Sequence, residues 1–133
     1  MSVVVGLCDD ADMDRIFHIV SDTFKHDEPY IDAVYPKHDT PAGHIQGKNR
    51  MLEQKHSDPT VRCLKATDTR TGKIIGQANW LCLEDKHVKD ELEGNFWDDN
   101  DEKEFAQQLY AQFAVCRREA VRAASGPVWS MLS

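Results

Sequence analysis

The sequence has no long apolar run. No stretch among the 133 residues approaches the roughly 20 consecutive apolar residues that a membrane-spanning helix needs. The start of the chain, residues 1–9, has no basic flank, and its apolar stretch is too short for a secretory signal. We therefore expect a cytoplasmic protein, and the composition, with 41% apolar and 29% charged residues, predicts one globular domain over residues 1–133.

Paired metal-binding and redox motifs are also missing. None of the four cysteines belongs to a CxxC or CxH pair, and each falls in an apolar stretch (Cys8, Cys63, Cys82 and Cys116). The six histidines show no HxxxH or HxH spacing. We therefore predict that the cysteines are small buried side chains rather than disulfides or zinc ligands, and that the chain has no metal site.

Excess positive charge is absent, and the net charge of −7 comes from one segment. Between Glu84 and Glu104, ten acidic residues stand against three lysines, while the rest of the chain is balanced. Such a chain is not attracted to phosphate backbones or anionic lipid, so we predict no nucleic-acid and no membrane partner. An acidic segment can attract a cationic amine or a basic partner, although a solvated loop is the more common explanation.

Apolar periodicity and turn residues define the expected elements. Thr40 followed by Pro41 predicts the N-terminus of a helix, Gly72 predicts a tight hairpin turn, and Pro29 is expected to end the first helix. The expected order is a strand at 2–7, a helix at about 11–25, an irregular stretch at 30–39, a helix at about 40–56, strands at 60–67 and 73–83, an acidic loop at 84–99, a helix at about 100–124, and a strand from 128.

Two apolar faces are expected from the same periodicity. The long helix places a stripe of six residues on one side (Phe105, Leu109, Phe113, Cys116, Ala120 and Ala123). The second hairpin strand places five on one face (Ile74, Gly76, Ala78, Trp80 and Cys82). We expect the helix stripe to be core or a dimer interface, and Trp80 to point inward.

This order resembles the N-terminal half of the GNAT superfamily of acyl-CoA-dependent N-acyltransferases, in a fungal-type branch. Five segments carry the resemblance, together with the inserted helix at about 100–124: Asp32-Ala33-Val34-Tyr35-Pro36, Met51-Leu52, Asp58-Pro59, Thr71 to Trp80, and Gly126-Pro127-Val128-Trp129. The resemblance implies a mixed α+β fold with the order β-α-α-β-β-α-β, a partial GNAT-like fold in which helices pack an antiparallel sheet.

The resemblance also implies acetyl-CoA as cofactor and an amine as acceptor. In the family, an Arg/Gln-x-x-Gly-x-Gly/Ala turn leading into a helix holds the pyrophosphate of the coenzyme. The 133 residues contain no such turn, and residues 72–76 belong to a hairpin strand instead. We therefore expect a truncated N-acetyltransferase domain without cofactor-binding residues, inactive alone and a marginal monomer or a homodimer through an exposed sheet edge.

Four residues are candidates for a site. Tyr35 and His38 lie where the family's substrate-side loop would be, although a rigid turn with Tyr35 packed on the second helix is the simpler explanation. Trp80 is a candidate for the acceptor groove, although core packing is the more common role. Glu84, at the exit of the hairpin, is a weak candidate for a general base, because nothing around it indicates desolvation.

Two alternatives to acyl transfer remain open at this point. The first is a non-catalytic GNAT-like protein that uses the sheet edge to dimerise or to bind a partner. The second keeps the scaffold for other small-molecule chemistry beneath Trp80. Cysteine–histidine catalysis by Cys63 or Cys82 has no local sequence signature to support it.

Overall fold

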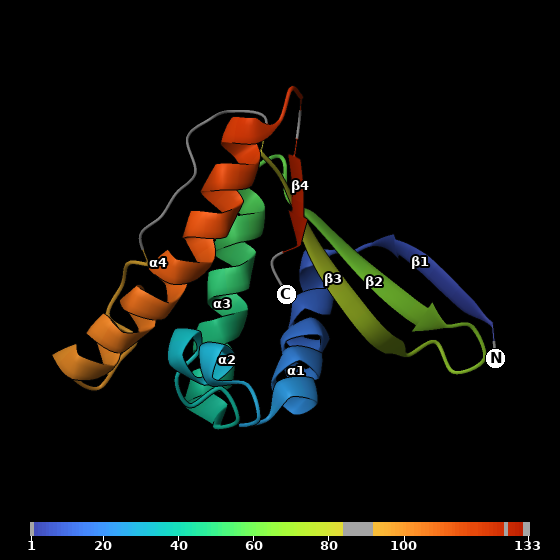
Figure 1. Cartoon of the computed structure of the whole chain (residues 1–133). Coiled ribbons are helices and arrows are strands. Elements are labelled where there is room, and N and C mark those ends of the chain that lie inside the picture. The colour runs from blue at the N-terminus through green and yellow to red at the C-terminus, as the bar shows by residue number, and fades with distance from the viewer. Residues whose placement is uncertain (1, 84–91, 127, 132–133) are drawn as a thin grey trace.

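Four antiparallel strands form one sheet in the order β1-β2-β3-β4, within the residues that the computed structural model describes (2–83, 92–126 and 128–131). Helices gather on one side of this sheet (Figure 1). The elements are β1 (Val3–Leu7), the 3₁₀ turn η1 (Asp10–Asp12), α1 (Met13–Phe24), α2 (Pro29–Val34), α3 (Pro41–Ser57), β2 (Arg62–Asp68), β3 (Ile74–Leu83), α4 (Asn100–Ala123) and β4 (Val128–Met131). The mixed α+β class and the antiparallel sheet are confirmed.

The turn and cap residues act as the sequence predicts. The Thr40 side chain accepts a hydrogen bond from the backbone N–H of Gly43, at 3.1 Å, and caps α3 with Pro41 in its first turn. Gly72 has a φ of 71° in the turn between β2 and β3. This left-handed conformation favours glycine, because a side chain would be strained there.

The segment that follows α1 differs from its prediction. It was expected to be irregular after Pro29, but Pro29 is the first residue of the short helix α2. The Glu28 side chain accepts a hydrogen bond from the Tyr30 N–H, at 3.3 Å. Proline fits the first helical position because no intrahelical partner awaits its missing N–H, so Pro29 begins α2. The first helix has already ended at Phe24, where Lys25 leaves the helical conformation with a φ of 48°.

The core forms where α1 packs between the sheet and α3. Ile16 and Phe17 of α1 are fully buried, and their cluster includes Cys8, Met13, Met51 and Cys63. Gly47 of α3 lies directly on the Phe17 ring, where an added Cβ would come within 2.0 Å of Cζ. This close approach explains why Gly47 is a glycine, although in the sequence it is expected only to weaken the helix.

The buried face of β3 is the opposite of the predicted one. Asn79 is 5% exposed and pairs with Cys63, which is 4% exposed, so these two residues face the helices. Trp80 is half-buried on the other face, and the prediction that it points inward is wrong. A register irregularity between Ala66 and Thr67 offsets Ile74 from the alternation, so Ile74 packs on the core although Gly76 does not share its face.

The long helix α4 is present, but its buried stripe is rotated from the predicted one. Ala106, Ala114, Arg117 and Val121 are buried, whereas Phe105 and Phe113 are 55% and 44% exposed. The reason is its neighbour, because α4 packs mainly along α2 and, among the described strands, contacts β4. Phe113 contributes to that contact although it is partly exposed, since its ring centroid lies 5.7 Å from that of Tyr30 in α2.

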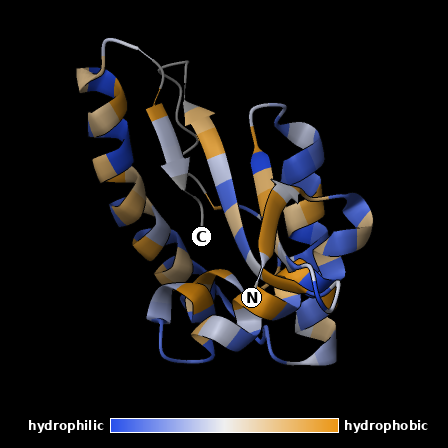
Figure 2. Cartoon of the chain, turned by 90° about the vertical axis from the view of Figure 1, so that its right-hand side faces the viewer, coloured by the Kyte–Doolittle hydropathy of each residue, from blue (hydrophilic) through white to orange (hydrophobic). Residues whose placement is uncertain are grey.

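One face of the sheet has no helix over it. Figure 2 views the sheet from the side away from the helices, and no helix lies in front of the strands. Cross-strand pairing puts Val5 beside Ala66 and Leu7 beside Leu64 on the same face as Trp80. Val5 is 64% exposed and Leu7 is 61% exposed. The sheet therefore presents an apolar face, which we call the open face. Separately, no helix in the described part of the chain is long and apolar enough to cross a membrane.

Candidate functional site

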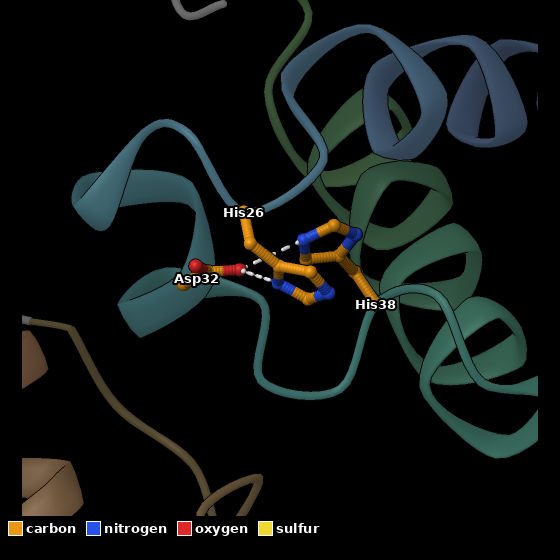
Figure 3. A group of neighbouring side chains, drawn as sticks. All are labelled: His26, Asp32 and His38. Atoms are coloured by element: carbon orange, nitrogen blue, oxygen red, sulfur yellow. Dashed lines mark hydrogen bonds and ion pairs between the residues drawn. The ribbon is translucent and has the colours of Figure 1, made fainter.

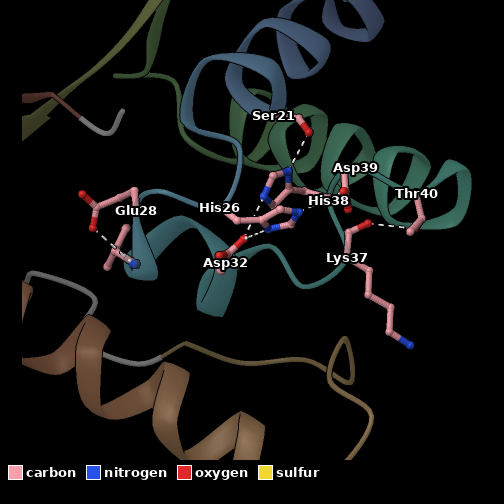
Figure 4. Close-up of polar contacts among 9 residues, drawn as sticks. Ser21, His26, Glu28, Asp32, Lys37, His38, Asp39 and Thr40 are labelled. Atoms are coloured by element: carbon pink, nitrogen blue, oxygen red, sulfur yellow. Dashed lines mark hydrogen bonds and ion pairs between the residues drawn. The ribbon is translucent and has the colours of Figure 1, made fainter.

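Polar side chains converge where the end of α1, the helix α2 and the start of α3 meet (Figures 3 and 4). We call this group the histidine–carboxylate cluster; it comprises Ser21, His26, Asp32, His38 and Asp39. Ser21 lies in α1, Asp32 in α2, and the other three in the connections. The turns around α2 bring these groups together, although 17 residues lie between Ser21 and Asp39 in the sequence.

The cluster is a continuous chain of short contacts. Asp32 Oδ1 lies 2.8 Å from His26 Nδ1 and 3.0 Å from His38 Nε2. The other ring nitrogens are also engaged, with His38 Nδ1 at 2.6 Å from Ser21 Oγ and His26 Nε2 at 2.9 Å from Asp39 Oδ2. Every ring nitrogen of both histidines therefore has a partner, and both rings direct one nitrogen at the same carboxylate oxygen (Figure 3).

The protonation states follow from these contacts. His26 lies between two carboxylates, so both of its N–H groups donate when it is an imidazolium, and the hydrogen bond to Asp32, followed by that to Asp39, raises its pKa. The hydrogen bond from His26 lowers the pKa of Asp39. In a neutral His38, Nε2–H donates to Asp32 and Nδ1 accepts from the Ser21 hydroxyl.

Burial divides the cluster into a fixed and an accessible side. His38 is 1% exposed and Ser21 is 8% exposed, whereas the His26 side chain is 61% exposed. Ser21, His38 and Asp32 follow the order of a Ser-His-Asp nucleophilic system. The Ser21 hydroxyl is nevertheless buried on the inner side of α1, where a substrate does not reach it, so this arrangement positions His38 rather than forming a nucleophile.

The predicted site residues fall in two places. Tyr35 and His38 both lie in the connection between α2 and α3, as expected for one loop. Tyr35 packs edge-on against Phe17, with ring centroids 5.3 Å apart, and beneath the guanidinium of Arg50 in α3, so its contacts are those of a packed turn. Trp80 lies on the open face of the sheet, and Glu84 lies outside the described residues.

An arginine in α3 joins the same region to the segment that precedes α4. The Arg50 guanidinium lies 4.1 Å from the ring centroid of Phe96 and 4.8 Å from that of Tyr35. Trp97 Nε1 donates to the carbonyl of Ala33 at 2.7 Å. The described end of the predicted acidic loop is therefore packed against α2 and α3 and is not simply a solvated loop.

Sequence reasoning missed the histidine–carboxylate cluster because it searched for short metal-binding spacings. His26, Asp32 and His38 are each six residues apart, a spacing that puts them on different faces of a helix, and they do not lie in a common strand. The available signal was the density of histidine and aspartate between residues 26 and 39. No family model, no curated protein and no solved structure matches this chain.

Proposed function

We propose that residues 1–133 form the acceptor side of a GNAT-type N-acyltransferase, which in its complete form transfers an acetyl group from acetyl-CoA to an amine. The chain by itself is not expected to catalyse this transfer. Its sequence contains no glycine turn at the start of a helix that would hold the pyrophosphate of the coenzyme.

The observation that carries the proposal is the order of elements around the sheet. A first strand is followed by helices, an antiparallel hairpin, an inserted helix and a fourth strand that pairs with the hairpin, as the resemblance implies. The open face is a second support, because it leaves Val5 and Leu7 uncovered in the described residues. Such an apolar face is suited to packing against further structure.

In this proposal the chain supplies acceptor contacts and little of the chemistry. The loop with Tyr35 and His38 would border the acceptor, whereas Trp80 lies on the opposite, open face of the sheet and would contact the further structure packed there. Burial raises the pKa of Tyr35, so its hydroxyl stays protonated and does not serve as a base. In this proposal Glu84, which lies outside the described residues, is the candidate for the general base that receives a proton from the amine.

Two experiments test the proposal. In calorimetry with acetyl-CoA, residues 1–133 are expected to show no saturable heat, and micromolar binding would contradict our account of the coenzyme site. Sequencing the transcript past the codon for Ser133 is the second test, and an in-frame Arg/Gln-x-x-Gly-x-Gly/Ala segment there would support the proposal. The extended protein should then release CoA from acetyl-CoA in the presence of an amine panel. Without that segment and that activity, the acyltransferase proposal fails.

A second function, self-association, is favoured by the edge strand β1. Its residues, Val-Val-Val-Gly-Leu, include no charge and no proline, the usual devices that keep an edge strand from pairing. β1 is at one end of the strand order, so one side of its backbone has no neighbour in the described sheet. A second copy of the chain could pair along this edge. A monomer in light scattering that unfolds cooperatively well above room temperature would exclude this function.

A further inference from the structure

We propose that His26, Asp32 and His38 bind a divalent transition-metal ion of the zinc type. Among the described residues, these three offer ligand atoms that all lie within 4.8 Å of one another. The atoms are His26 Nδ1, Asp32 Oδ1 and His38 Nε2, and Figure 3 shows both rings directed at the carboxylate. Two imidazoles and one carboxylate are a common set of protein ligands for zinc and for iron(II).

The far side of each imidazole carries the partner that a metal-bound histidine requires. A ligating histidine usually donates its other N–H to a carboxylate or another oxygen, which fixes the ring orientation. Asp39 Oδ2 takes this position at His26 Nε2, at 2.9 Å, and Ser21 Oγ takes it at His38 Nδ1, at 2.6 Å (Figure 4). With a metal on Nε2, His38 would carry its proton on Nδ1 and donate it to Ser21.

The backbone is held in an unusual conformation next to both histidines. Lys25 has a φ of 48° and Lys37 has a φ of 56°, and these are the non-glycine residues with positive φ in the described part of the chain. Each immediately precedes a histidine of the cluster. Such conformations cost free energy and gather at functional sites, so their position here supports a built site.

Burial gives the site one rigid ligand and one route of entry. The side chain of His38 is fully buried, that of Asp32 is 36% exposed, and that of His26 is 61% exposed. A metal ion can therefore enter from the exposed His26 side, and the buried His38 completes the set of three protein ligands. Three protein ligands leave a fourth tetrahedral position for water or for a donor atom of a substrate.

The chemistry of the ligands selects the class of ion. Magnesium and calcium prefer sets made of oxygen, whereas imidazole nitrogen suits zinc, cobalt and iron. Ligands about 2.0–2.1 Å from a tetrahedral zinc are about 3.3 Å from one another. The two separations from Asp32 Oδ1, 2.8 and 3.0 Å, are within a few tenths of an ångström of that value, and all three ligand atoms lie within 4.8 Å of one another.

The test uses the whole 133-residue chain, stripped of metal with a chelator and dialysed. Titration with zinc by calorimetry is expected to give one ion per chain, and zinc should raise the melting temperature. Cobalt(II) should give the visible absorption of a tetrahedral site without the near-ultraviolet bands of thiolate ligation. Those bands would place the ion on cysteine and overturn the proposal.

Variants separate ligation from a purely structural network. His26→Ala and Asp32→Asn remove ligands that are at least partly exposed, and we expect saturable binding to be lost in both. Asp39→Asn removes only the partner of a ligand and is expected to weaken binding about 10–100-fold. His56→Ala is the matched control, because His56 is an exposed histidine that contacts Asp10 at the other end of α3.

Circular dichroism of each metal-free variant checks that it is folded. We expect His26→Ala and Asp39→Asn to fold normally, because both side chains are exposed. If the cluster is purely structural, each substitution should change the melting temperature relative to wild type by the same amount with and without zinc. No binding of zinc or cobalt at micromolar concentrations, or binding that His26→Ala and Asp32→Asn leave unchanged, would overturn the proposal. The acyltransferase proposal does not depend on this result, because it requires no metal.

Discussion

Cys8 Sγ and Cys63 Sγ lie 2.8 Å apart in the core, where the chain leaves β1 beside β2. The Cys8 N–H also donates to the Cys63 carbonyl at 2.8 Å. The two thiols are free and buried, as the sequence predicts. The same prediction is wrong for Cys82, which is half-buried, and for Cys116, which is exposed on α4.

The four cysteines should therefore differ in reactivity. Burial, followed by the hydrogen bond with Cys63, raises the pKa of Cys8, and burial also raises the pKa of Cys63, so little reactive thiolate forms at either. We expect iodoacetamide to modify Cys116 first, and Cys8 and Cys63 only after denaturation. Peptide mass spectrometry over time measures this order, and modification of Cys8 as fast as Cys116 would contradict it.

Gly47→Ala should destabilise the protein although alanine is the better helix former. The gain in helix propensity is about 1 kcal/mol, but the new methyl group would lie 2.0 Å from Cζ of the buried Phe17 ring. Overpacking of this kind costs roughly 1–3 kcal/mol, and we expect the upper part of that range because the Phe17 ring is fully buried. We expect a net loss of about 1 kcal/mol or more in urea unfolding. Gly6→Ala is the control, because nothing lies within 4 Å of its added Cβ.

Asp12 should make the stability depend on pH in the acidic range. The hydrogen bond from Lys65 Nζ at 2.6 Å, followed by that from the Asp9 backbone, holds the pKa of Asp12 below its usual value of 3.8. The stabilisation is therefore complete above about pH 4 and is lost as the pH falls below that value. Asp12→Asn should cost about 1 kcal/mol at neutral pH.

Unfolding of both proteins at neutral and at acid pH checks this prediction. The difference between wild type and Asp12→Asn should shrink towards zero in acid, because the wild-type carboxylate is then protonated as well. A difference that stays constant with pH would show that the ion pair is not its origin. Asp22→Asn serves as the control, since Asp22 is an exposed aspartate on α1.

Val5→Lys should reduce self-association without damaging the fold. Val5 is 64% exposed in the edge strand β1, and a lysine there opposes pairing with a second strand. We expect light scattering to show a shift from dimer to monomer, with stability within about 0.5 kcal/mol of wild type. Ile45→Lys is the matched control, because Ile45 is 56% exposed but lies on α3. Equal effects of both substitutions would indicate a general effect of charge.

The sequence predicted features that depend on neighbouring residues. Thr40 caps α3 and Gly72 occupies a left-handed turn, because caps and turns are set by hydrogen bonds and steric limits within a few residues. The hairpin of β2 and β3 follows from the same local rules. The mixed α+β class follows from the order of these elements.

The errors arose where a packing partner decides the outcome. Alternation along β3 identifies two faces, but only the position of α1 makes the Asn79 face the buried one. Periodicity in α4 identifies an apolar side, but Ala106 and Ala114 are buried instead of Phe105 and Phe113, in a helix that packs mainly along α2 rather than on the sheet. Helix propensity alone also failed to predict α2. This helix begins at Pro29, and the Glu28 side chain caps it.

By itself, the sequence determined the elements, their order and their local caps, because those depend on interactions within a few residues. Only the tertiary structure decided which faces are buried and which polar groups meet. His26, Asp32 and His38 become a site because two lysines with positive φ and the short helix α2 turn the chain back on itself. That juxtaposition depends on packing against α1 and α3, which no spacing in the sequence records.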